Sequence, residues 1–136
     1  MLWDFLVALP IDLQKITQAI FSIDDRIRYF AILDKEKVGI QFEKYADEVK
    51  PFTPDPQARR TLLERLETSL RERWKKERYG EIKYILKSYE NVDYLIFLAG
   101  RYVFIISSKP QVLSEIISRL TPKLNDLREM LEVENW

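Results

Sequence analysis

The chain has 136 residues, of which 46% are hydrophobic and 32% are charged, and this balance predicts one globular domain rather than a disordered chain. Lys and Arg together number 22, as do Asp and Glu, so there is no net charge to attract nucleic acid or an anionic membrane. The chain contains no Cys and no His. Histidine triads, cysteine nucleophiles, disulfides and zinc sites built on these residues are thereby excluded.

The first ten residues, MLWDFLVALP, form an apolar extension to the core domain that we predict for residues 11–132. The extension has no basic residue and ends at Pro10, so it resembles neither a signal peptide nor a membrane span of about 20 apolar residues. The cytoplasm is therefore the expected location. Two hypotheses remain for the extension: it folds back beside Trp136 and the last helix, or it docks on a protein partner as an amphipathic anchor. Its large apolar residues are Leu2, Trp3, Phe5, Leu6 and Leu9, and the first four are the candidate docking residues.

A helix and a β-hairpin are predicted in the first third of the core domain. Residues 11–21 have apolar side chains at helical spacing, and residues 27–33 are rich in β-branched and aromatic side chains. Apolar and other residues alternate over residues 38–42, and the charged residues 34–37 lie between the two runs, which predicts a hairpin. The apolar residues of the helix are Leu13, Ile16, Ala19 and Ile20.

A long middle helix is predicted over residues 58–78. Asp55 and Pro56 suit its start, because a carboxylate caps the first amides and proline fits the first turn. Gly80 suits its end, because glycine adopts the left-handed conformation that closes many helices. The apolar residues recur every four positions and form one stripe of Ala58, Leu62, Leu66, Leu70 and Trp74, with Leu63 beside it.

Three more strands are predicted, at residues 82–89, 94–99 and 102–107. The links between them are too short for a crossover, so neighbouring strands must be antiparallel.

A last helix is predicted to begin near residues 108–110. Pro122 removes one amide donor and is expected to kink or split this helix near residues 119–121. The apolar seam of the helix consists of Leu113, Ile117, Leu120, Leu124, Leu127 and Leu131.

The predicted fold class is α/β (α+β), with a five-stranded, mostly antiparallel sheet. The element order is helix, two strands, long helix, three strands, helix. Several strands are apolar on both faces, and a sheet of this kind must be covered on both faces. Helices are therefore expected on each side.

The segments RIRYFAILDKEKVGIQF and DYLIFLAGRYVFIISSK, with ISRLTPKL near the end, resemble small archaeal proteins of the Roadblock, longin and profilin-like architecture. The resemblance covers residues 16–124. It implies a sheet with the middle helix on one face and the terminal helices on the other. Roadblock-type proteins commonly pair through the middle helix and an adjoining sheet edge, and serve small GTPases or assemble larger platforms. The resemblance thus implies a regulatory role, service to a small GTPase or a regulatory assembly, and a homodimer, and it does not account for the N-terminal extension.

The middle helix supplies the candidate interface. If one flank packs on the sheet, the remaining apolar and aromatic surface is available for a dimer contact, and interfaces favour Trp, Tyr and Arg. The candidate residues are Leu63, Leu66, Leu70, Arg71, Trp74 and Arg78.

The basic end of this helix, residues 71–78, allows an alternative function of weak nucleic-acid binding. Acidic residues interleave with the basic ones at ion-pair spacing, as in Glu67 and Arg71, and this favours an ordinary solvated face. Nucleic acid is therefore not the expected partner.

Three other motifs do not indicate catalysis or metal binding. The three glycines are far apart and form no phosphate-binding loop. Asp24 and Asp25 are adjacent, so their side chains diverge, and a solvated turn is predicted. Glu43, Asp47 and Glu48 lack the regular ligand alternation of a calcium loop.

The sequence therefore predicts a non-enzymatic protein-interaction and regulatory module without a cofactor or metal. A sensory domain that binds a small molecule is the alternative from another functional class, because folds of similar outline hold ligands in a pocket.

Overall fold

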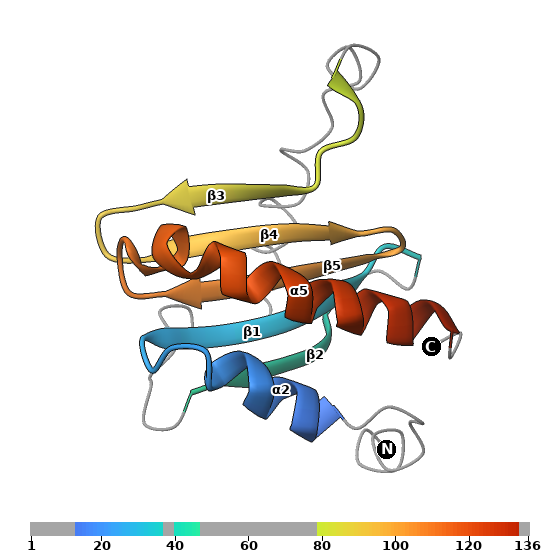
Figure 1. The fold of residues 1–136 in the computed structure, drawn as a ribbon, viewed down its shortest axis with the longest axis horizontal. Coiled ribbons are helices and arrows are strands. Elements are labelled where there is room, and N and C mark those ends of the chain that lie inside the picture. Colours follow the sequence, from blue (N-terminus) through green and yellow to red (C-terminus); the bar gives the residue numbers. More distant parts are fainter. Residues whose placement is uncertain (1–12, 37–39, 47–78, 134–136) are drawn as a thin grey trace.

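The computed structural model describes residues 13–36, 40–46 and 79–133 of the chain. Within these residues a five-stranded sheet carries two helices, and every pair of neighbouring strands is antiparallel (Figure 1). The strand order is β2-β1-β5-β4-β3. The elements are α2 (Leu13–Phe21), β1 (Ile27–Asp34), β2 (Ile40–Tyr45), β3 (Tyr84–Ser88), β4 (Asp93–Ala99), β5 (Tyr102–Ser108) and α5 (Val112–Val133).

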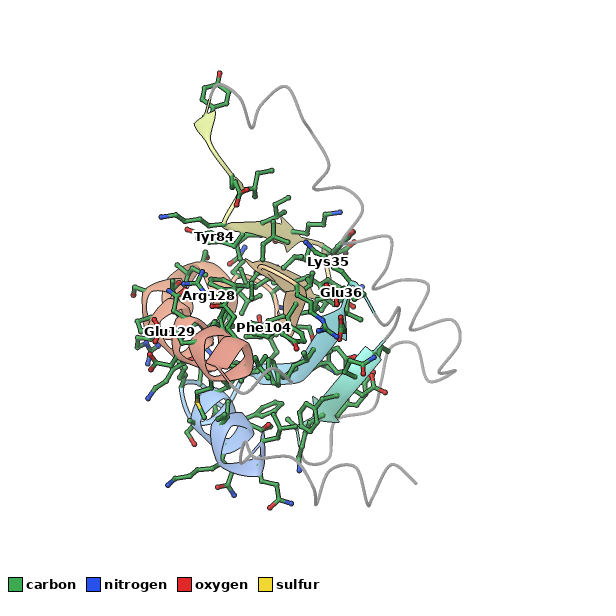
Figure 2. The ribbon with its side chains drawn as sticks, turned by 90° about the vertical axis from the view of Figure 1, so that its right-hand side faces the viewer. Lys35, Glu36, Tyr84, Phe104, Arg128 and Glu129 are labelled. Atoms are coloured by element: carbon green, nitrogen blue, oxygen red, sulfur yellow. The ribbon has the colours of Figure 1, made fainter. Side chains whose placement is uncertain are left out.

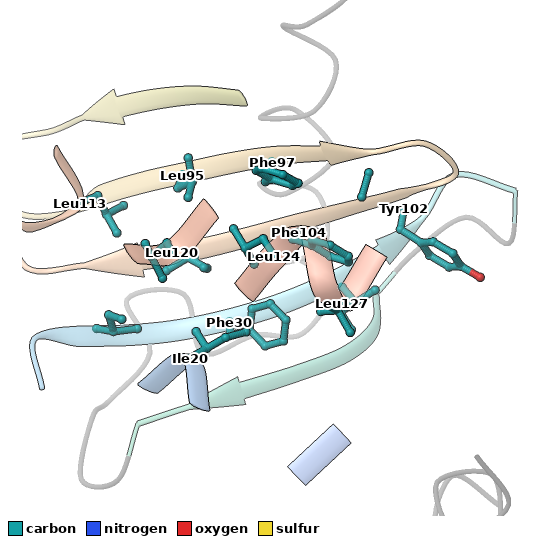
Figure 3. Close-up of a cluster of buried hydrophobic side chains, with 14 of the residues drawn as sticks. Ile20, Phe30, Leu95, Phe97, Tyr102, Phe104, Leu113, Leu120, Leu124 and Leu127 are labelled. Carbon is teal, nitrogen blue, oxygen red and sulfur yellow. The ribbon is translucent and has the colours of Figure 1, made fainter. Parts of the chain in front are cut away.

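The main core lies between the sheet and both described helices. Phe30 of β1 and Phe104 of β5 are fully buried there, with ring centroids 6.4 Å apart, and Phe97 stacks on Phe104 at 6.1 Å (Figure 3). Helix α2 adds Leu13 and Ile20 to this cluster. Helix α5 adds Val112, Leu113, Ile116, Leu120, Leu124, Leu127 and Leu131.

The opposite face of the sheet is also apolar. Its buried cluster takes side chains from β1, β4 and β5, which alternate along each strand with those of the main core. Both described helices pack on the first face, as expected for the terminal helices, whereas the middle helix predicted for the second face lies outside the described residues. The second cluster consists of Tyr29, Ala31, Leu33, Ile96, Val103 and Ile105.

Strand β2 continues to Tyr45, three residues beyond the predicted end, while residues 38 and 39 lie outside the described part of the chain. Contacts with β1 explain the extension. The Tyr29 hydroxyl donates a hydrogen bond to Glu43 Oε2 at 2.6 Å, and the rings of Tyr29 and Tyr45 lie 4.6 Å apart.

Helix α5 runs through Pro122 without a break, so the predicted split is wrong. Pro122 is exposed, whereas Leu120 and Leu124 on either side of it are fully buried. Packing of this buried face compensates for the hydrogen bond that proline removes. The predicted seam also needs one correction, because Ile116 is fully buried and Ile117 only partly.

Helix α5 begins at Val112, later than predicted, because residues 107 and 108 still belong to β5. Asp93 at the start of β4 fixes the backbone of the residue that precedes the helix. Its carboxylate accepts hydrogen bonds from the Gln111 amide at 2.8 Å and from the Ser88 hydroxyl at 2.7 Å. Gln111 has a φ of 70°, a left-handed conformation that is uncommon outside glycine. This buried carboxylate therefore joins the end of β3 to the start of α5.

Candidate interaction surfaces

The residues chosen from the sequence as interaction sites lie outside the described part of the chain. This applies to both the middle-helix group and the N-terminal group. The first comprises Leu63, Leu66, Leu70, Arg71, Trp74 and Arg78, and the second comprises Leu2, Trp3, Phe5 and Leu6.

The polar group at the end of β1 consists of Asp34, Arg101 and Glu36. Arg101 donates two hydrogen bonds to the buried Asp34 carboxylate, from Nε at 2.9 Å and from Nη2 at 2.8 Å. Arg101 Nη1 also lies 3.2 Å from Glu36 Oε2, and the hydrogen bonds to Asp34 raise the pKa of Arg101. This bidentate pair ties the β4–β5 turn to the end of β1, which is a structural role.

The predicted turn at Asp24 and Asp25 is present between α2 and β1. Asp24 accepts hydrogen bonds from the Arg26 amide at 2.8 Å and from the Arg26 guanidinium at 2.9 and 2.7 Å. The bonds to the guanidinium are the main reason that the pKa of Asp24 lies well below its ordinary value. Arg26 also reaches Glu115 of α5 at 3.4 Å, so the turn joins β1 to the start of the last helix.

The acidic residues that could have served as cation ligands have other roles where the structure describes them. Glu43 accepts a hydrogen bond from Tyr29, and Asp47 and Glu48 lie outside the described residues. Within residues 13–36, 40–46 and 79–133, no three His, Cys, Asp or Glu side chains are grouped so that they could hold a metal ion. No described helix is both long enough and apolar enough to cross a membrane.

Strand β3 forms one edge of the sheet and carries two exposed large apolar side chains, Tyr84 and Leu86. Its hydrogen-bonded neighbour in the sheet is β4. Large hydrophobic residues of the described part are exposed at five positions, of which two belong to β3 and one follows it directly. Tyr84 (40% exposed) and Leu86 (40%) lie in β3 and Tyr89 (50%) follows it, whereas Tyr79 (71%) and Met130 (39%) lie elsewhere. Sequence reasoning predicted a strand here without identifying it as an interaction surface.

Tyr84 and Leu86 point to the sheet face that carries α5. Tyr84 is paired with Phe97 and Leu86 with Leu95, and directly paired residues of antiparallel strands share a face. Phe97 and Leu95 belong to the main core beneath α2 and α5, which fixes the side. Helix α5 packs on β4 and β5, so Tyr84 and Leu86 remain partly exposed. Figure 2 shows Tyr84 on β3. We call these two residues the β3 strip.

The backbone groups of β3 alternate between β4 and the outer edge. The Lys83 carbonyl accepts a hydrogen bond from the Leu98 amide at 2.9 Å, so Lys83 faces β4. Because successive residues of a strand direct their backbone groups to opposite sides, Tyr84, Leu86 and Ser88 direct theirs to the outer edge. An additional antiparallel strand would hydrogen-bond to these three residues.

Comparison with known proteins shows what the chain resembles. No protein-family model and no curated protein matches its sequence. Among solved structures, "MglB with tetrameric arrangement" superposes with a TM-score of 0.70 at 13% identity, over 95% of this chain and 96% of that one. Gliding protein MglB from Thermus thermophilus superposes with a TM-score of 0.66 at 14% identity, over 92% of this chain and 96% of that one. A Roadblock/LC7 domain from Streptomyces avermitilis superposes with a TM-score of 0.61 at 11% identity, over 90% of this chain and 96% of that one. The fold is therefore Roadblock/LC7-like.

Proposed function

On the basis of this Roadblock/LC7-like fold, we propose that the chain is a non-enzymatic regulatory module of the cytoplasm that forms a homodimer and binds a protein partner. The observation that carries the proposal is the exposed apolar edge at β3. It follows residues 58–78 in the chain, the predicted middle helix that supplies the candidate interface residues. Exposed apolar residues gathered on one edge of a sheet are typical of an interaction surface.

The dimer contact combines the stripe of the middle helix with the outer edge of β3. Roadblock-type proteins commonly pair in this way, and both parts of this chain carry residue types that interfaces favour. The helix contributes Leu63, Leu66, Leu70, Arg71, Trp74 and Arg78. The edge contributes the backbone groups of Tyr84, Leu86 and Ser88.

Pairing of β3 with β3 of a second copy is best satisfied when the two-fold axis passes through Leu86. Leu86 then lies opposite Leu86 of the second copy, Tyr84 lies opposite Ser88, and all five strand residues take part. Lys87 lies opposite Ile85, so no like charges meet. If the axis moved to Ile85, Lys83 would oppose Lys87, and if it moved to Lys87, two lysines would oppose each other, which is unfavourable.

A small GTPase is the partner class that the Roadblock resemblance supports. The absence of His and Cys from the whole sequence supports a role in binding rather than catalysis. The Asp34–Arg101 and Asp24–Arg26 pairs also support it, because each carboxylate is held in a structural contact. A fold hosts many functions, so binding to a purified GTPase must be measured directly.

The dimer is tested by light scattering on the intact chain and on a variant with Leu70→Glu and Trp74→Glu. We expect the parent to be a dimer at tens of micromolar and the variant to be a folded monomer, with folding checked by circular dichroism. Ser118→Glu, on the exposed side of α5, is the matched control and should remain dimeric. A monomeric parent would refute the homodimer, whereas a dimeric, folded double variant would exclude the middle helix as its interface.

A further inference from the structure

The β3 strip stays uncovered even when β3 pairs with a second copy. Edge pairing uses backbone groups in the plane of the sheet, whereas Tyr84 and Leu86 stand roughly perpendicular to it on the α5 side. Pairing about Leu86 would place the strips of two copies side by side. A four-residue apolar floor would then lie between the two α5 helices.

The width of this floor matches one α-helix. Helix α5 packs over β4 and β5, and neighbouring strands are about 4.8 Å apart. The axis of α5 is therefore about 10 Å from the two-fold axis, measured across the sheet. A helix over the two-fold axis would run at about 10 Å from each α5, which is the usual spacing of packed helices.

The N-terminal extension has the pattern that such a floor would bind. Leu2, Phe5, Leu6 and Leu9 stand at positions i, i+3, i+4 and i+7, the spacing by which an amphipathic helix lays one apolar face in a groove. Eight residues of helix span about 12 Å. The five residues of β3 span about 17 Å, so the floor has room for one such helix lengthwise.

The extension cannot reach this floor within its own chain. Three residues separate Leu9 from Leu13, where α2 begins, so at most about 14 Å of chain is available. Helix α2 packs on β1, three strands away from β3, so the middle of the floor lies beyond the reach of this length of chain. Helix α5, about 10 Å in diameter, lies between α2 and β3 (Figure 1). The floor is centred on the two-fold axis, about 17 Å from β1 across the sheet, and this distance is the same in both copies of the dimer.

We propose that the β3 strip is a docking site for residues 2–9 of a further copy of this chain, so that dimers join into a larger assembly. The proposal rests on the dimer proposed above, because two strips are needed to make the floor. Each dimer has one floor and two extensions. Two dimers that exchange one extension each therefore form a closed assembly of four chains.

The first test measures binding of a fluorescein-labelled peptide, MLWDFLVALPI, by fluorescence anisotropy. The receptor is the full chain with Phe5→Ser and Leu6→Ser, so that its own extension does not compete. We expect saturable binding at one peptide per two chains. Adding Tyr84→Lys should weaken binding at least ten-fold, because a charge would enter the floor, while Ser88 remains opposite it across the dimer. Adding Met130→Lys, at the exposed apolar residue away from β3, should not change binding.

The second test uses light scattering and separates this proposal from the dimer itself. We expect the parent to exceed the dimer mass at high concentration, and we expect Phe5→Ser with Leu6→Ser, and separately Tyr84→Lys, to give dimers. Loss of the dimer in the Leu70→Glu, Trp74→Glu variant bears on the proposed function alone. The docking proposal is overturned if the parent never exceeds a dimer, or if Tyr84→Lys leaves both mass and peptide binding unchanged. It is also overturned if Met130→Lys, rather than Tyr84→Lys, abolishes binding.

Discussion

Strands β5 and β3 belong to the same antiparallel sheet, yet their side chains lie in opposite surroundings. All seven residues of β5 are buried, whereas three of the five residues of β3 are exposed and the other two are only partly buried. Both strands are rich in apolar and aromatic residues. In β5 these residues fill cores on two faces of the sheet, while in β3 they remain accessible at an edge. The same residue chemistry therefore serves stability in the first strand and is available for binding in the second.

The largest expected effect is on stability, through the centre of the sheet. Phe104→Ala removes a fully buried ring that packs against Phe30 and Phe97, and should lower the free energy of unfolding by about 3–5 kcal/mol. Leu86→Ala on β3 should cost about 1 kcal/mol or less, because Leu86 is already 40% exposed. Urea unfolding of both variants gives the two values. Equal losses would refute the division between β5 and β3.

A smaller loss of stability is expected at the join between β1 and the β4–β5 turn. Asp34→Asn breaks the bidentate pair with Arg101 at a buried carboxylate, and should cost about 3 kcal/mol. The matched control is Glu36→Gln, whose side chain is 70% exposed and which should cost less than about 1 kcal/mol. If the Asp34 variant unfolds at the same urea concentration as the control, Arg101 does not hold this end of the sheet.

The smallest expected effect concerns pH and the turn between α2 and β1. The folded state lowers the pKa of Asp24 below its ordinary value of 3.8, chiefly through the Arg26 hydrogen bonds. The resulting stabilisation is fully present above that ordinary value and is lost as the pH falls below it. The melting temperature of the parent should therefore fall more steeply than that of Asp24→Asn between about pH 5 and pH 2. Identical slopes in scanning calorimetry would show that the turn does not contribute.

Local pattern was enough to predict the five strands and the terminal helices, because the strands are short apolar runs and the helices show helical spacing. The order of the strands in the sheet could not be predicted from local pattern, since β1 and β5 are adjacent in the sheet but far apart in the sequence. The Asp34–Arg101 pair joins residues 67 positions apart and had no local signal. Pro122 does not split the helix as one of the two predicted outcomes required, because the buried face packs on both sides of it.

The edge position of β3 was not predicted for a related reason. The segment IKYILKSY reads as a strand, but only the strand order shows that it lies at an edge. One signal was present in the sequence. Lys83 and Lys87 interrupt the apolar residues, and lysine on a strand is a common protection of exposed edges. Lysines interspersed with apolar residues are therefore a sequence signal of an edge strand.

The most direct test of the proposed dimer is disulfide crosslinking, which the absence of Cys makes unusually clear. Directly opposed residues of a hydrogen-bonded antiparallel pair have Cα atoms about 5.5 Å apart, which is within the range of a disulfide. Leu86→Cys should therefore crosslink two chains under mild oxidation, as seen on a non-reducing gel. Ser88→Cys should not, because the two copies of residue 88 would lie about 13 Å apart along the strands. Crosslinking of Leu86→Cys alone would support pairing of β3 about Leu86, and a Leu86→Cys chain that stays uncrosslinked would contradict it.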